Sequence, residues 1–239
     1  MLDLHGYGYR LLEGGLLTLE LAILSLILAV VLGLVTASAK LSSSIVIRAI
    51  AKAYTLVIRG VPDLVLMMLL FYGGQIGINM ATDWLYYEFD VDIFVNVDAF
   101  VAGVITIGII FGAYMSETFR GAFMAVDGGL LEAARAYGMR PWTVFRRIRF
   151  PLMMRHALPG LSNNWMVLLK TTALVSIIGL SDMVKVAAEA TKATHEPFLF
   201  MIPVALGYLA ISSVSEWCFM KLKARYDVGF GAEGASWNN

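Results

Sequence analysis

The sequence has a single cysteine and few charged residues. Cys218 has no second thiol within the 239 residues, which excludes an internal disulfide and a thiolate metal site. Charged residues form 15% of the chain and hydrophobic residues 59%, whereas an ordinary soluble domain has about 25% charged residues. Basic and acidic residues both number 18, so the net charge gives no argument for a nucleic-acid partner.

Several catalytic motifs are also missing. The sequence contains no Walker A motif, no nucleophile elbow and no metal-ligand spacing among its histidines. We therefore predict that the chain is not an enzyme and binds no metal or cofactor itself. Ala37-Ser38-Ala39 looks like a signal-peptide cleavage site. We reject it, because the apolar segment before it is longer than the roughly 7–15 residues of a signal-peptide core.

Long apolar stretches dominate what is present. A helix needs about 20 mostly apolar residues to cross a membrane core about 30 Å thick. Five stretches meet this requirement, at residues 16–39, 61–78, 99–115, 161–180 and 197–219. The sequence thus predicts an all-α, polytopic membrane protein with about five transmembrane helices. A single membrane domain is expected over residues 1–228, followed by a disordered tail over residues 229–239.

The basic residues predict how the chain crosses the membrane, because lysine and arginine are retained on the cytoplasmic side. They gather in the segments at 40–52, 120–155 and 221–225. The segment between the second and third spans is acidic and lacks lysine and arginine; its acidic residues are Asp83, Glu88, Asp90, Asp92 and Asp98. We therefore place the N-terminus outside and the C-terminus in the cytoplasm.

The longest predicted cytoplasmic segment, residues 127–160, has the pattern of a helix-turn-helix element. Asp127 can cap a helix at 130–137, and Gly138 can end it in the left-handed conformation. Pro141 suits the first turn of a second helix, which we expect to stop before Pro151, with Pro159 opening the fourth span. On composition alone, an amphipathic loop lying on the bilayer surface is the favoured interpretation.

This segment resembles the EAA loop of ABC importer permeases. The matching positions are Glu132, Ala133, Ala134, Gly138, Ile148 and Pro151. Phe150 stands where that family usually has leucine. Arg59-Gly60-Val61-Pro62 is similar to the Arg-Gly-Thr-Pro of polar amino-acid permeases, and residues 163–176 resemble their fourth helix, with departures at Thr171 and Ala173. Over its whole length the chain is most similar to the Q-type permeases of basic amino-acid uptake systems.

The resemblance implies a type I ABC importer permease fold in the bacterial inner membrane, surrounded by lipid. It implies import of arginine, ornithine, lysine or histidine. The implied partners are two ATPase subunits that use ATP and Mg, a periplasmic amino-acid-binding protein and a second permease subunit, which we expect to be a paralogue. Glu132, Ala133, Ala134, Gly138, Ile148 and Pro151 would couple the chain to the ATPase.

Polar residues within the spans are candidates for the passage, since such residues usually face a bundle interior. The candidates are Glu20, Asp63, Glu117, Asn163, Asn164, Lys170 and Asp182. We assign the passage to Asp63, Glu117, Asn163, Asn164 and Lys170. Each also has a structural interpretation: Glu117 can pair with Arg120 across one helical turn, and Lys170 can snorkel.

Two other classes of protein remain open on the residues alone. A self-sufficient secondary transporter or channel would suit the Gly60/Pro62 break, because broken helices line transport sites. Two features argue against it: the EAA-like loop is present, and an evident inverted repeat is lacking. A structural membrane scaffold or a membrane-bound enzyme is the second alternative, and the lack of a nucleophile elbow, a metal motif and a nucleotide-binding loop argues against it.

Overall fold

The computed structural model describes residues 4–90 and 95–226. The predicted disordered tail lies outside these residues. Within the described ranges the chain is helical, without strands. The helices are α1 (Gly8–Lys40), α2 (Ile45–Gly60), α3 (Asp63–Phe89), α4 (Ala99–Met124), α5 (Gly128–Ala136), α6 (Pro141–Val144), α7 (Phe150–Thr171), α8 (Met183–Thr194) and α9 (Pro197–Tyr226). A π-helical segment, Phe145–Arg149, precedes α7, and a 3-10 segment, Thr172–Ile178, follows it.

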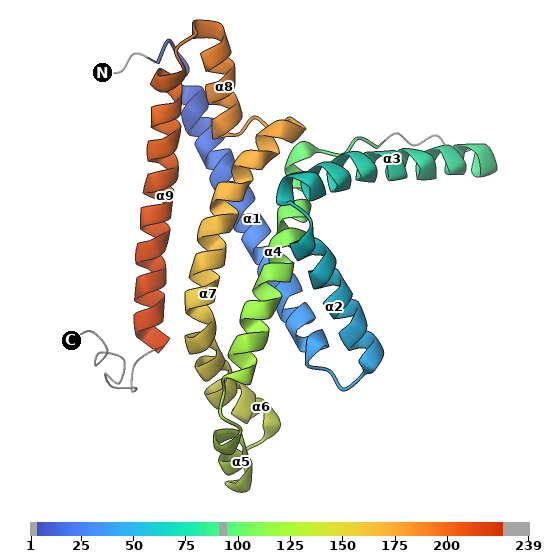
Figure 1. The fold of residues 1–239 in the computed structure, drawn as a ribbon, viewed down its shortest axis with the longest axis vertical. Helices are drawn as coiled ribbons and strands as arrows, with labels where there is room; N and C mark the ends of the chain where they lie inside the picture. The colour runs from blue at the N-terminus through green and yellow to red at the C-terminus, as the bar shows by residue number, and fades with distance from the viewer. Residues whose placement is uncertain (1–3, 91–94, 227–239) are drawn as a thin grey trace.

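Helices α1, α4 and α7 form the centre of the bundle, and α9 runs alongside α7 (Figure 1). Glycines allow α1 and α4 to pack closely. A Cβ atom built on Gly33 of α1 would lie 2.9 Å from the Met115 Cβ atom, and one on Gly112 of α4 would lie 2.8 Å from the Leu32 Cβ atom. Small residues at such contacts are the usual means by which helices pack within a membrane.

Large apolar side chains cover the outside of the bundle. Leu16 on α1 is 69% exposed, Leu56 on α2 is 76% exposed and Leu209 on α9 is 61% exposed. Of the helices within the described ranges, α1, α3, α4 and α9 are long and apolar enough to cross a membrane, and α7 with α8 adds a fifth span if this pair, bent by 51°, is counted as one. The prediction of an all-α membrane protein with about five spans is confirmed.

The segment between the first two predicted spans is a helix, α2, and not a loop. A short turn joins it to α1, and the Arg48 guanidinium holds the turn by donating to the carbonyl oxygens of Ser42 (3.0 Å) and Ser43 (3.3 Å). The cations of this segment, Lys40, Arg48 and Lys52, predict a cytoplasmic loop. A helix can carry such cations on one face while its other face packs on α1 and α4.

Helix α3 extends further than the predicted span at 61–78. It starts at Asp63, directly after the Gly60–Pro62 break, and continues to Phe89, so that Asp83 and Glu88 are helical. Figure 1 shows α3 projecting sideways from the bundle. Gln75 of α3 binds the segment that precedes α4. Its amide donates to the Val95 carbonyl (3.0 Å) and accepts from the Val97 N–H (2.7 Å).

The predicted breaks at Pro151 and Pro159 are wrong. The chain is continuously helical from Pro141 to Ile178. Pro151 lies in the first turn of α7, directly after the π-helical segment, and Pro159 lies inside the helix. Proline lacks an N–H and its ring crowds the preceding turn, so a wider π-helical turn before Pro151 can accommodate it. Helix α8 was also not predicted.

Candidate functional site

Residues 127–149 form a hook at one end of the bundle, opposite the end that carries α8 (Figure 1). The Asp127 carboxylate caps α5 by accepting from the Gly129 N–H at 2.7 Å. The chain leaves α5 through Gly138, whose φ is +76°, and Pro141 opens α6. Gly138 and Met139 donate their N–H groups back to the Arg135 and Ala134 carbonyls, at 2.9 and 3.1 Å. The predicted helix-turn-helix geometry is thus present.

The hook presents a mixed polar and apolar surface. Glu132 and Ala133 are exposed, whereas Ala134 is buried at 6% exposure. Tyr137 (89% exposed) and Trp142 (69% exposed) are also uncovered on this element. Large exposed apolar side chains next to a polar rim are typical of a protein-docking surface. Tyr137 and Trp142 are not among the residues predicted from the sequence, although bulky aromatic residues in a predicted cytoplasmic segment are a signal that could have identified them.

Ile148 and Pro151, the last two coupling positions predicted from the sequence, lie together in a groove of about 650 Å³. Leu130 of α5 forms another part of its wall, and Arg225 and Tyr226 at the end of α9 contribute as well. The structure therefore connects the distal part of the EAA-like loop both to α5 and to the C-terminal end of α9.

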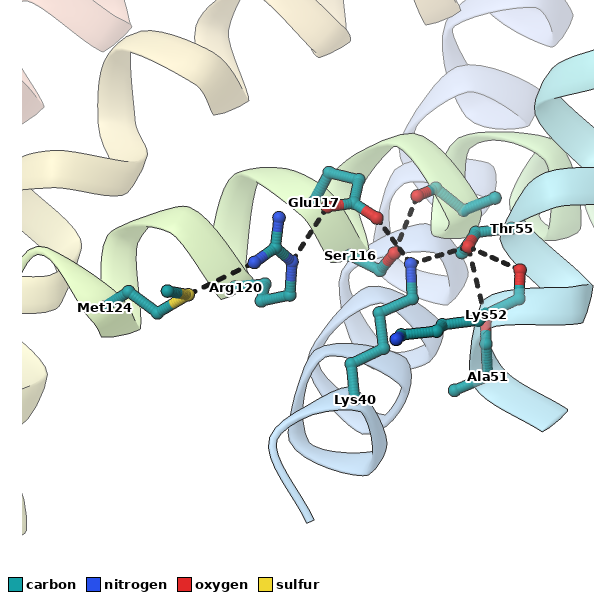
Figure 2. A network of polar contacts seen from close by, with 9 residues as sticks. Lys40, Ala51, Lys52, Thr55, Ser116, Glu117, Arg120 and Met124 are labelled. Carbon is teal, nitrogen blue, oxygen red and sulfur yellow. Dashed lines mark hydrogen bonds and ion pairs between the residues drawn. The ribbon is translucent and has the colours of Figure 1, made fainter. Parts of the chain in front are cut away.

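A polar network joins α1, α2 and α4 (Figure 2). The Lys40 ammonium donates to the Thr55 hydroxyl and to the Glu117 carboxylate, both at 2.5 Å. The other Glu117 oxygen accepts from the Arg120 guanidinium at 2.9 Å. The Lys40 side chain is only 4% exposed, so its charge depends on this pairing. The predicted Glu117–Arg120 pair is present, but the sequence did not reveal Lys40 or Thr55 as partners.

A groove of about 780 Å³ opens beside this network. Lys40, Thr55 and Glu117 line it, together with Arg59 and Tyr114. The Arg59 guanidinium lies over the Tyr114 ring, 5.5 Å from its centroid. The groove thus connects the ion pair with the end of α2.

Helix α7 exposes one face along most of its length. His156, Pro159, Asn163, Val167 and Lys170 are all exposed and recur at intervals of three or four residues, which places them on one side of the helix. Asn164, the next residue after Asn163, turns away from this face, and its amide donates to the Thr118 hydroxyl of α4 at 3.1 Å.

The predicted passage residues do not converge on one site. Glu117 lines the groove beside α2 and Asp63 begins α3, whereas Asn163 and Lys170 occupy the exposed face of α7. Asn164 bridges α7 to α4 and Asp182 is a buried N-cap of α8, so both have structural roles here. No group of three or more potential metal-ligating side chains occurs within residues 4–90 and 95–226.

With this helical fold and hook, the chain belongs to the family of binding-protein-dependent transport system inner membrane components, which it matches over residues 29–227. It is therefore a membrane permease subunit of an ABC transporter. A self-sufficient transporter or channel is disfavoured, and the prediction that the chain is a transport subunit and not an enzyme is confirmed.

The chain is 52% identical to the histidine/lysine/arginine/ornithine transport system permease protein HisQ of Salmonella typhimurium, over 95% of this chain and 97% of that protein. It is 38% identical to the nopaline transport system permease protein NocQ of Agrobacterium fabrum, over 90% of each chain. Among solved structures, an amino acid ABC transporter crystallised with histidines is 31% identical, with a TM-score of 0.75 over 94% of this chain and 97% of that chain.

Proposed function

We propose that this permease imports basic amino acids, namely arginine, ornithine, lysine or histidine, into the bacterial cytoplasm. The observation that carries the proposal is the 52% identity to a permease of histidine, lysine, arginine and ornithine transport over nearly the whole of both chains. The Q-type resemblance of the sequence supports the same cargo.

The hook would dock on a separate ATPase subunit that hydrolyses ATP with Mg. Glu132 and Ala133 are exposed on α5, and Tyr137 and Trp142 provide apolar area beside them. Gly138 fixes the angle between α5 and α6, and Ile148 and Pro151 continue this surface toward α7. Closure of two ATPase subunits would then move the hook and shift the bundle between two states, each facing one side of the membrane.

The hook end would face the cytoplasm, with the N-terminus on the periplasmic side and the C-terminal end of α9 inside. The turn between α1 and α2, the hook and the end of α9, which are the three basic segments, all lie toward the same end of the bundle (Figure 1), and this arrangement supports that orientation. The opposite end would receive the periplasmic amino-acid-binding protein.

A second permease subunit, expected to be a paralogue, would complete the passage. The exposed face of α7 supports this arrangement, because Asn163 and Lys170 are costly to expose to lipid and would instead face water or a partner. Asp63 and Glu117 are proposed to contribute from the α2–α4 side. Asn164 would act by holding α7 against α4.

The test is ATP hydrolysis by the complete complex in liposomes, stimulated by the binding protein loaded with each amino acid in turn. We expect stimulation by basic amino acids, and loss of stimulation in Glu132→Lys without loss of membrane insertion. Asp83→Lys is the matched control, because it reverses an exposed carboxylate on α3, far from the hook. Stimulation only by neutral or acidic amino acids would refute the cargo, and full stimulation of Glu132→Lys would refute the docking surface.

A further inference from the structure

The break between α2 and α3 carries two opposite charges that do not neutralise each other. Arg59 is in the last turn of α2 and Asp63 is the first residue of α3, with Gly60, Val61 and Pro62 around the break between them. Within residues 4–90 and 95–226, neither Arg59 nor Asp63 forms a salt bridge, although only four positions separate them. The Asp63 carboxylate accepts no hydrogen bond from these residues either.

Tyr114 of α4 packs against the first of these charges. The Arg59 guanidinium is 5.5 Å from the centroid of the Tyr114 ring, and Asp63 is half-buried at the start of α3. Arg59, Gly60 and Tyr114 line the groove of about 780 Å³ described above. One cation and an aromatic ring therefore line an open groove, and one anion, Asp63, follows directly after the break.

Unpaired charges within membrane helices are costly, and they are retained mainly where a ligand or a passage satisfies them. Discontinuous helices in transporters commonly supply such sites, since the broken ends leave polar groups uncovered. Glu117, whose carboxylate lines this groove, is unsuited to the task in this state because Lys40 and Arg120 occupy its two oxygens. The Arg59 guanidinium and the Asp63 carboxylate, which form no salt bridge, thus suit a ligand that carries both a negative and a positive charge.

We propose that Arg59 and Asp63 bind the α-carboxylate and the α-ammonium groups of the transported amino acid. These two groups share one carbon atom, so a single zwitterionic head can reach a cation and an anion on either side of the break. The planar guanidinium of Arg59 can bind a carboxylate with two parallel hydrogen bonds. The side chain of the amino acid would lie toward the groove, and Tyr114 would limit the space around the head group.

This inference rests on the proposed function only in that the cargo is an amino acid. The site recognises the part that all α-amino acids share, and it leaves discrimination between side chains to other residues or to the binding protein. An amino-acid site here also explains why Arg59 and Asp63 form no salt bridge at the break. The coupling role of the hook does not explain it.

The experiment measures equilibrium binding of labelled L-arginine to the purified complex of both permeases and the ATPase, without the binding protein. Competitors are agmatine, which lacks the α-carboxylate, and 5-guanidinopentanoate, which lacks the α-ammonium. The wild-type complex should bind arginine about 10- to 100-fold more tightly than either analogue, the range expected for one charge-assisted hydrogen bond.

Arg59→Gln should lose the preference for arginine over agmatine and keep the preference over 5-guanidinopentanoate. Asp63→Asn should show the reverse pattern, and Lys52→Gln, which changes another groove cation, should alter neither preference. A merely structural role of Arg59 on Tyr114 would weaken all three ligands equally, and that result would overturn the inference. Arg59→Lys retains the charge and serves if Arg59→Gln does not assemble; it should keep part of the preference over agmatine.

A wild-type complex that binds the two analogues as tightly as arginine would also overturn the inference. If basic amino acids fail to bind and a neutral amino acid binds, the proposed cargo is wrong. The same crossed design then applies to that amino acid, with its decarboxylated amine and its deaminated acid as competitors.

Discussion

Replacement of Glu117 by glutamine should destabilise the bundle by removing the charge that satisfies Lys40. The Lys40 side chain is 4% exposed and bonds to Thr55 and Glu117, whereas Glu117 is 28% exposed and also bonds to Arg120. Removal of one partner from a fully buried ion pair costs about 3–5 kcal/mol. Because Glu117 is partly exposed and water can screen its charge, we expect a smaller loss, about 2–3 kcal/mol in the free energy of unfolding.

A double-mutant cycle tests this reasoning. Lys40→Met removes the buried cation, so the double variant with Glu117→Gln should lose at least about 1.5 kcal/mol less than the sum of the two single losses. The assay is reversible unfolding in mixed micelles followed by tryptophan fluorescence. Arg120→Gln is the control, and it should cost only about 0.5–1 kcal/mol because Arg120 is 38% exposed. Additive losses for Lys40 and Glu117 would refute the buried pair.

The same variants test the second role predicted for Glu117. If Glu117 also lines the passage, uptake of basic amino acids should fall in Glu117→Gln complexes that assemble normally. Unchanged cation uptake in such complexes would remove Glu117 from the passage and leave it as a structural residue only.

Three other predictions concern glycines and a helix cap. Gly33→Leu should lower the free energy of unfolding by about 1–3 kcal/mol, because the added Cβ would lie 2.9 Å from the Met115 Cβ atom. Gly77→Leu is its control: an added Cβ there meets no atom within 4 Å, so the unfolding transition should stay unchanged. Gly138→Asp should abolish transport and coupled ATP hydrolysis but not membrane insertion, since φ is +76° there, where an L side chain is strained, and the substitution adds a negative charge to the proposed docking surface. Asp127→Ala should cost about 1 kcal/mol through loss of the α5 cap, and binding-protein-stimulated ATP hydrolysis should fall measurably.

Local signals predicted the hook well. The cap at Asp127, the left-handed turn at Gly138 and the helix start at Pro141 each depend on one or two neighbouring residues. Such signals are visible in a sequence because they require no knowledge of the rest of the fold. The apolar stretches predicted α1, α4 and α9 for the same reason, although α1 extends beyond both of its predicted ends, and α4 and α9 extend beyond their predicted C-terminal ends.

Contacts between residues far apart in the sequence were not predicted. The partner of Lys40 is 77 positions away, and Asn164 meets Thr118 across 46 positions. No spacing rule connects such pairs, so Lys40, Thr55 and Thr118 were not identified. The helix breaks predicted at Pro151 and Pro159 are wrong because proline normally ends a helix. Here a π-helical segment and tertiary packing keep the helix continuous.

The central claim is that the hook lies in the cytoplasm against the ATPase. Ala133 is exposed on α5 and Cys218 is the only cysteine, so Ala133→Cys in a Cys218→Ser background gives a single labelling site. A membrane-impermeant maleimide should label this site in inside-out vesicles stripped of the ATPase, and should fail to label it when the ATPase is bound or in right-side-out vesicles. Labelling from the periplasmic side, or equal labelling with and without the ATPase, would contradict the account.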